Sequence, residues 1–197
     1  MRYFLMTSLL LATILLKAQN KTDYYYEIPE YPGTYNAGTV MARMVDGLGF
    51  RYYWATAGLT SDNLSYKANE DGRTMAETLD HIWSLSRIVM NAIKGEPTTF
   101  DVDLSRLNFE EKRNQTLEFI KTASETLKKS DASDFENFDM IFKYPDGNSR
   151  EYPVWNVLNG PLSDALWHVG QVVLMRRGAG NPFSSNVGVL EGTVREN

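Results

Sequence analysis

Four segments of this chain carry apolar residues at steps of three and four, the spacing that places side chains on one face of an α-helix. These segments span residues 39–59, 75–94, 108–130 and 154–178. A helix with an apolar stripe has to bury that stripe against other elements, and several helices of this length do so by forming a bundle. The pattern therefore predicts an all-α fold, a four-helix bundle.

Local signals in the sequence predict where two of these helices begin or bend and where a hairpin lies between helices. Thr74 and Glu77 have the spacing of a capping box, so the second helix should begin at residue 75. Pro161 lies inside the fourth segment and predicts either a kink there or a start near residue 159. Residues 138–144 alternate between apolar and polar side chains, and Pro-Asp-Gly-Asn follows as a turn signal. We therefore expect a small β-hairpin before the last helix.

The first twenty residues have a different character. Arg2 is followed by an uncharged, mostly apolar run over residues 3–16, shorter than the ~20 residues that a membrane-spanning helix needs. Ala18 is a small residue near the expected cleavage point. The pattern predicts a signal peptide over residues 1–19 and a periplasmic or extracellular protein. The alternative is an N-terminus that stays attached as an anchor.

Composition limits the remaining possibilities. A chain of 197 residues suits one domain, and we divide the mature part into an extended N-terminal arm (20–35), the bundle (36–182) and a C-terminal tail (183–197). The net charge of −5 argues against nucleic-acid binding, which normally needs a basic face. We expect no membrane span in the mature protein. Because the chain has no cysteine, any metal must be held by His, Asp, Glu or amide side chains.

An acidic and a basic side chain stand together in the fourth segment. Asp164 and His168 are one helical turn apart, so their side chains can converge on one point. Gln171 and Met175 continue the same stripe, and apolar residues flank it on both sides. Because the flanks leave no obvious side for solvent, we expect Asp164 to be buried and to need a compensating partner.

The chain has one other histidine, His81, which lies beside the apolar stripe of residues 75–94. If that helix packs against the fourth one, His81, Asp164 and His168 can form a cluster of three ligands. Neutral imidazoles and a carboxylate suit Zn²⁺, Ni²⁺ or Fe²⁺, and three protein ligands leave a position open for water or substrate. The alternative is an Asp164–His168 pair in a core, with His81 against a backbone carbonyl.

These residues belong to a longer resemblance, to the DinB-like family. GLTSDNLSYKANEDGRTMAETLDHI, the hairpin, DALWHVGQVVLMRR and the GNPF after the last helix are similar to that family over roughly residues 36–182. The first of these pieces ends in the family's metal-ligand histidine, here His81. The third places His168, Gly170 and Gln171 in register with the family's H-x-x-x-H-R-G-Q. The resemblance implies a four-helix bundle that holds a divalent metal, often nickel or zinc, through three histidines and often forms a homodimer.

The chain departs from the family pattern at two positions. Asp164 stands where the family has the first histidine of H-x-x-x-H, which gives a set of two histidines and one carboxylate. Val169 stands where the family often has arginine. Some members of the family use low-molecular-weight thiols for transfer or isomerisation. The changed ligand and the expected export favour activation of water over thiol chemistry in this chain.

Two functions remain open from the sequence. One is a metal-dependent enzyme, of hydrolase or thiol-transferase type, that acts on an unknown small molecule and uses Gln171 to orient a ligand or substrate. The other is a non-catalytic exported bundle that binds a metal, a small ligand or a protein, with the Tyr-rich arm as its contact surface. Arg176 and Arg177 could receive an anionic substrate, and Tyr52 and Tyr53 could line a pocket. The ordinary explanation for the two arginines is their favourable position at the negative end of a helix dipole. The ordinary explanation for the two tyrosines is core packing.

Overall fold

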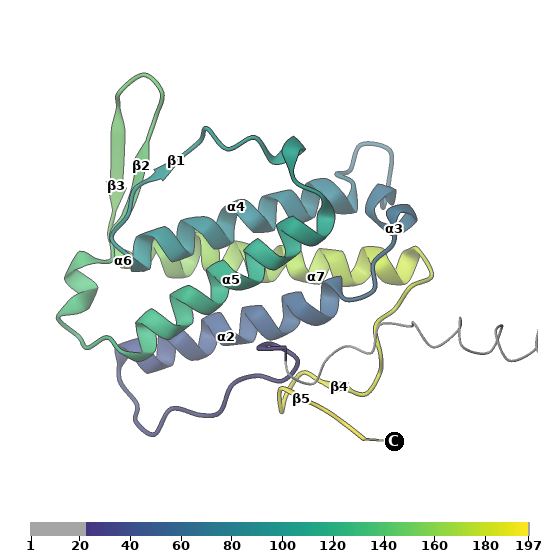
Figure 1. The fold of residues 1–197 in the computed structure, drawn as a ribbon, viewed down its shortest axis with the longest axis horizontal. Coiled ribbons are helices and arrows are strands. Elements are labelled where there is room, and N and C mark those ends of the chain that lie inside the picture. The colour runs from purple at the N-terminus through teal and green to yellow at the C-terminus, as the bar shows by residue number, and fades with distance from the viewer. Residues whose placement is uncertain (1–22, 197) are drawn as a thin grey trace, which may run out of the picture.

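The computed structural model describes residues 23–196, so the predicted signal peptide over residues 1–19 lies outside the described residues. Four long helices form a bundle (Figure 1), as the sequence predicts: α2 (Ala37–Thr56), α4 (Met75–Ile93), α5 (Phe109–Lys128) and α7 (Ser163–Gly178). The shorter elements are α3 (Ser61–Ser65), β1 (Thr98–Thr99), β2 (Met140–Lys143), β3 (Ser149–Tyr152), α6 (Val154–Val157), β4 (Val187–Gly188) and β5 (Thr193–Val194). Short 3₁₀ turns cover Leu104–Arg106 and Asp134–Asn137.

The order of the helices around the bundle differs from their order in the chain. Both α2 and α4 pack against α5 and α7, so α2 and α4 lie diagonally across the bundle (Figure 1). In a simple up-and-down bundle, consecutive helices would be neighbours. Here residues 57–74, which include α3, carry the chain across the diagonal. The arrangement places α4 directly beside α7, although more than 60 residues separate them in the sequence.

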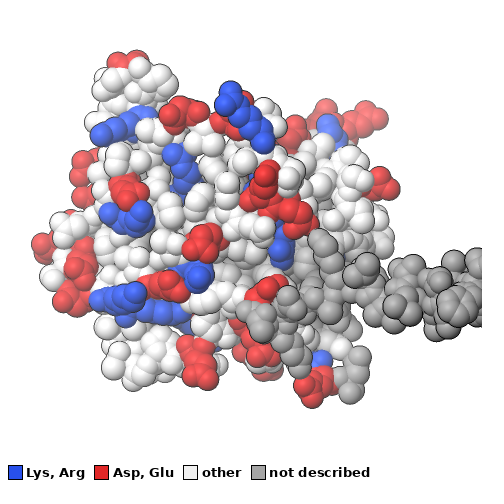
Figure 2. Space-filling model, viewed as in Figure 1, with Lys and Arg blue, Asp and Glu red and all other residues white. Residues whose placement is uncertain are grey.

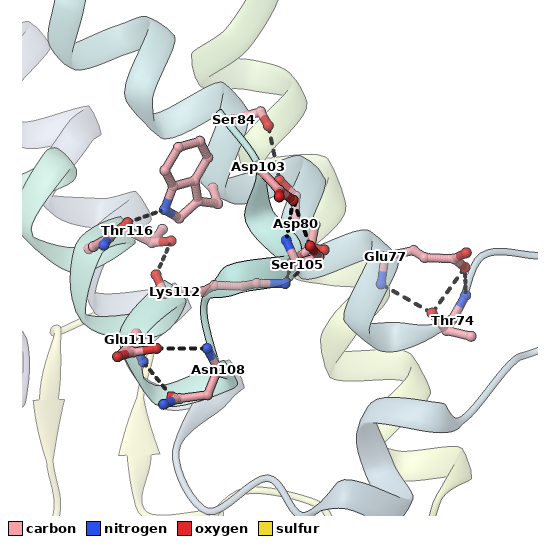
Figure 3. A network of polar contacts seen from close by, with 12 residues as sticks. Thr74, Glu77, Asp80, Ser84, Asp103, Ser105, Asn108, Glu111, Lys112 and Thr116 are labelled. Carbon is pink, nitrogen blue, oxygen red and sulfur yellow. Dashed lines mark hydrogen bonds and ion pairs between the residues drawn. The ribbon is translucent and has the colours of Figure 1, made fainter. Parts of the chain in front are cut away.

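Capping boxes begin the two helices that follow α3. Thr74 Oγ1 accepts a hydrogen bond from the Glu77 backbone N–H at 3.1 Å, and Glu77 Oε2 accepts one from the Thr74 N–H at 2.7 Å (Figure 3). Asn108 and Glu111 form the same reciprocal pair at the start of α5. The predicted start of the second helix at residue 75 is therefore confirmed, and the cap fixes the first turn of α4, directly before the turn that carries His81.

An ion pair joins α4 to α5 next to that histidine. The Lys112 ammonium lies 2.7 Å from Asp80 Oδ1 and 3.0 Å from Oδ2 (Figure 3). Both side chains are partly shielded, with 19% and 34% of their surfaces exposed. A bidentate, half-shielded contact of this kind holds its two helices in register better than an isolated surface pair. It therefore helps to fix the rotation of α4.

The predicted hairpin precedes the last helix. Strands β2 and β3 pair antiparallel, with Met140 opposite Tyr152, and β1 adds a third strand parallel to β2. The fourth helical segment is divided into α6, a π-helical turn at Leu158–Leu162, and α7. Gly160 leaves the helical conformation, with φ −94° and ψ −111°, immediately before Pro161. The kink, rather than a start near residue 159, is therefore what the structure shows.

The two ends of the described chain lie together against α2. Tyr25 inserts its ring into the core, where it is 2% exposed, and its hydroxyl donates to Asp46 Oδ1 at 3.1 Å. The Ile28 N–H donates to the Gly192 carbonyl at 2.8 Å, which ties the N-terminal arm to the C-terminal tail. Among residues 23–196, no helix is long and apolar enough to cross a membrane. Acidic and basic side chains are interspersed on the face shown in Figure 2.

Candidate metal centre

Three polar side chains meet between α4 and α7. His81 lies on the second turn of α4, and Asp164 and His168 lie on the first two turns of α7. One carboxylate oxygen, Asp164 Oδ2, is 3.3 Å from His81 Nε2, and the other, Oδ1, is 3.3 Å from His168 Nε2. The two imidazole rings are nearly perpendicular, with centroids 4.6 Å apart. One potential ligand atom from each residue lies within 4.8 Å of the others, so the three can reach a single ion.

The cluster is more open to solvent than the sequence suggests. The side chains of Asp164 and His81 are 42% and 33% exposed, and that of His168 is 14% exposed. The expectation that Asp164 would be buried with no solvent side is therefore wrong. A helical wheel treats the segment as one continuous helix, whereas the backbone breaks at Gly160 and α7 begins at Ser163, directly before Asp164. The carboxylate consequently lies near the end of a packed element and beside a surface cavity.

Gln171 determines how His168 presents its ring. Gln171 Oε1 is 2.8 Å from His168 Nδ1, and a carbonyl oxygen can only accept, so Nδ1 carries the hydrogen. In the neutral ring, Nε2 then offers a lone pair. That nitrogen faces Asp164 Oδ1, which is also an acceptor. Two facing acceptors are satisfied by a proton on Nε2 or by a metal ion, so the donor set fits a bound cation. The contact lies within α7 and is compatible with the orienting role that the sequence suggests for Gln171.

The environment of His81 favours the form that can bind a metal. Burial lowers the pKa of His81 below its ordinary value of 6.5, and the nearby charge of His168 lowers it further. The hydrogen bond to Asp164 acts in the opposite direction but is outweighed. His81 is therefore a neutral imidazole at neutral pH, as metal ligation requires.

The cavity beside Asp164 was not predicted from the sequence. It has a volume of about 530 Å³ and lies between α4, β2, the π-helical turn and α7. Its walls include Ile88, Phe142 and Trp167, of which Trp167 is 73% exposed. The signal that could have identified it is Trp167 itself, a large aromatic residue one turn after Asp164 on a helix with a polar stripe. Phe142 could be placed only once β2 was known to pack near α4.

Arg176 and Arg177, the two arginines that could receive an anionic substrate, do not line this cavity. Arg176 is 2% exposed, and its guanidinium donates to the carbonyls of Trp54, Ala55 and Ala57 at 2.8, 3.0 and 3.1 Å. It therefore caps the C-terminal end of α2 and is unavailable to an anionic substrate. Arg177 is exposed and lines a different cavity.

The two tyrosines of α2 belong to the core. Tyr52 and Tyr53 are 1% and 2% exposed, and the hydroxyl of Tyr53 donates to Asp23 at 2.9 Å. Neither residue lines the cavity beside Asp164. Core packing accounts for Tyr52, whereas Tyr53 also lines a separate cavity with Asp23 and Arg113.

Comparison with known proteins supports the fold. No family model matches this sequence, and no curated protein matches it. Among solved structures, the chain is similar to YfiT from Bacillus subtilis, with a TM-score of 0.51 and 13% sequence identity over 81% of this chain and 99% of that one. YfiT is described as a probable metal-dependent hydrolase with an unusual four-helix bundle topology. The likeness supports the four-helix bundle that the sequence predicts.

Proposed function

We propose that this chain is an exported, divalent-metal-dependent enzyme of the hydrolase type, with His81, Asp164 and His168 as metal ligands. The observation that carries the proposal is the convergence of one carboxylate and two imidazole nitrogens on one point between α4 and α7. The fold it shares with a protein described as a probable metal-dependent hydrolase supports the same class of activity.

Each residue of the cluster has a distinct part in this proposal. His81 and His168 would bind the ion through Nε2, and Asp164 would bind through a carboxylate oxygen. When bound, such an ion supplies a Lewis acid that polarises a substrate oxygen and lowers the pKa of a water molecule. Gln171 holds the His168 ring in the required tautomer and orientation by accepting from its Nδ1–H.

The adjoining cavity indicates what the substrate resembles. Its volume of about 530 Å³ lies within the range of ~300–1,000 Å³ that is usual for small-molecule sites. Apart from Asp164, the side chains that line it are uncharged, and most are apolar. We therefore expect a substrate whose reacting bond lies at Asp164 and whose uncharged, apolar substituent packs against Phe142 and Trp167.

One observation favours a second function, a bundle that binds a metal or ligand without catalysis. Among the described residues that line the cavity, Asp164 is the only ionisable side chain. Ser163, which also lines the cavity, donates through its hydroxyl to the Leu158 carbonyl at 2.6 Å. The cavity therefore offers no separate general acid or base, and any proton transfer would depend on the three ligands themselves or on solvent.

The two functions are separated by binding and turnover measured on the same protein. Metal-stripped protein would be reloaded with Zn²⁺, Ni²⁺ or Fe²⁺ and assayed on esters, amides and thiol conjugates with apolar substituents. Metal-dependent turnover that His168→Ala abolishes supports the enzyme. Binding without turnover supports the second function, and absence of binding contradicts both metal-based proposals. Trp155→Ala, at a 72% exposed residue outside the cavity, is the control and should leave turnover unchanged.

Export is a separate part of the proposal and has its own test. The sequence of residues 1–19 supports it through a basic start, an apolar run and a small residue near the end. Expression of the full chain in a bacterium, followed by fractionation and intact-mass measurement, should find the protein outside the cytoplasm and lacking about residues 1–19. A full-length product retained in the cytoplasm contradicts export.

A further inference from the structure

A second cavity lies on the other side of α7 from the histidine cluster. It has a volume of about 400 Å³ and is lined along α7 by Leu166, Gly170, Val173 and Arg177, among others. These residues follow one another at steps of four, three and four and so form one stripe. On a helix with 3.6 residues per turn, Gly170 is roughly 200° from His168. The two sites therefore use opposite faces of one helix.

The walls of this second cavity come from three parts of the chain. Phe50 and Trp54 of α2 face the stripe of α7, and Phe183 and Val187 of the C-terminal tail close it from outside. Phe50, Trp54 and Val187 are 1%, 6% and 7% exposed, so these walls are firmly packed. The volume lies within the range of ~300–1,000 Å³ that is usual for small ligands. A pre-formed apolar cavity of this size suits a single apolar chain.

The charges at the cavity all have one sign. Of the lining residues that the structure describes, only Arg51 and Arg177 are charged. Arg51 donates to the Gly47 carbonyl at 3.0 Å, and within residues 23–196 neither arginine forms an ion pair with an acidic side chain. An arginine in the last turn of a helix is explained by the helix dipole. Arg51, however, is five residues before the end of α2 and has no such explanation.

We propose that this second cavity binds a free single-chain amphiphile with an anionic head, such as a medium-chain fatty acid. The apolar chain would lie between α2, α7 and the tail. The head would interact with Arg51 and Arg177, because guanidinium groups form charge-assisted hydrogen bonds with carboxylates. The proposal is independent of the metal site, since none of His81, Asp164 and His168 lines this cavity.

Ligands of equal chain length test the requirement for charge. Isothermal titration below the micellar concentration would compare decanoate, 1-decanol and decyltrimethylammonium on the full mature protein. We expect one saturable site that prefers decanoate over decyltrimethylammonium. The double variant Arg51→Gln/Arg177→Gln should weaken decanoate binding by about tenfold or more, the effect of about 1.4 kcal/mol, and leave 1-decanol binding unchanged. Equal binding of decanoate and decyltrimethylammonium, or no binding of decanoate, overturns the proposal.

Gly170 provides a test of the location. Gly170 lines the cavity, and a Cβ added there meets nothing within 4 Å, so alanine fits without a clash and a larger side chain can occupy the cavity. Because glycine is a poor helix former, the substitution should not destabilise α7. Gly170→Phe should abolish binding of both decanoate and 1-decanol, whereas Gly170→Ala, the matched control, should retain it. Circular dichroism would verify that both variants are folded.

Two further outcomes separate this proposal from its alternatives. His168→Ala should leave decanoate affinity unchanged, whether or not the metal proposal is correct, and a loss of decanoate binding in that variant contradicts a second site. Sedimentation would determine whether another copy of the chain occupies the cavity instead. A wild-type dimer that Gly170→Phe converts into a monomer overturns the amphiphile proposal in favour of a self-association surface.

Discussion

At the scale of single residues, Asp164 most distinguishes this cluster from one built of imidazoles alone. Its two oxygens face two different Nε2 atoms, each at 3.3 Å, and its side chain is 42% exposed. A carboxylate so exposed does not need the two histidines to compensate for burial. Its position between them, with His168 held as an acceptor by Gln171, is therefore better explained by a shared cation than by core stability.

Replacement of the carboxylate tests this explanation. Asp164→Asn should weaken Zn²⁺ binding by more than about tenfold, because even the loss of a residue that only supports a metal ligand commonly costs about 10–100-fold. Asp164→His restores three imidazoles and should retain Zn²⁺ binding. Competition titration with a chromophoric chelator would measure both variants. An Asp164→Asn variant with wild-type affinity would contradict the role of the carboxylate as a ligand.

The pH dependence of metal binding follows from the state of His81. A proton on either imidazole competes with the metal, so affinity falls as pH falls. Because the pKa of His81 is lowered from 6.5, this ring stays neutral to lower pH than an ordinary histidine. We expect Zn²⁺ affinity to change little between about pH 8 and 7 and to fall clearly by about pH 5. Titrations at several pH values would check this, and an affinity that stays constant down to about pH 5 would argue against imidazole ligands.

At the scale of elements, the end of α2 depends on a residue that is far away in the sequence. Arg176 of α7 donates to three carbonyls at that end, and burial lowers its pKa to about 10, so it remains charged at neutral pH. The last carbonyls of a helix have no partner within the helix. The fork of the guanidinium supplies several donors at once, which a lysine cannot reproduce.

Loss of this buried cap should destabilise the protein. Arg176→Leu leaves the carbonyls of Trp54, Ala55 and Ala57 without their donor, and we expect the free energy of unfolding to fall by about 2–4 kcal/mol. Arg176→Lys should recover only part of this loss. The neighbouring exposed residue is the control, since Arg177→Gln should change stability by less than about 0.5 kcal/mol. Urea unfolding would measure all three, and equal effects at both positions would contradict the capping role.

A pair of glycines in α2 tests how the arm packs. A Cβ on Gly49 would collide with the ring of Tyr25, whereas a Cβ on Gly47 would meet only the flexible end of Arg51 at 3.2 Å. Gly49→Ala should therefore destabilise the protein by about 1–3 kcal/mol, and Gly47→Ala should be neutral or slightly stabilising. Thermal unfolding would compare them. The loss of stability caused by Gly49→Ala should be smaller when Tyr25 is also replaced by alanine. An equal loss in the Tyr25→Ala background would contradict a collision between the new Cβ and the Tyr25 ring.

The sequence predicted the elements that repeat a local pattern and missed those that do not. The apolar stripes and the Thr74 cap located the long helices, and alternation located the hairpin. The helix α3, the strand β1 and the β4–β5 pair are too short to show a period. The role of Arg176 could not be predicted either, because an arginine in the last turn of a helix is ordinarily in solvent.

At the scale of the whole molecule, the diagonal order of the bundle makes the cluster possible. Because α2 and α4 do not pack side by side, α7 can lie against α4 and bring Asp164 and His168 to His81. Helical spacing predicted that His81, Asp164 and His168 lie close together if α4 packs against α7. No local pattern specifies which helices meet, since that depends on the packing of the complete bundle. Their use as metal ligands stays a prediction.

The most direct test of the central claim is a crystal of residues 20–197 grown with Zn²⁺ and measured at the zinc absorption edge. The account predicts one strong anomalous peak between α4 and α7, within about 2.0–2.2 Å of Nε2 of His81, Nε2 of His168 and a carboxylate oxygen of Asp164. A fully loaded crystal with no peak there, or with zinc bound only elsewhere, would contradict it.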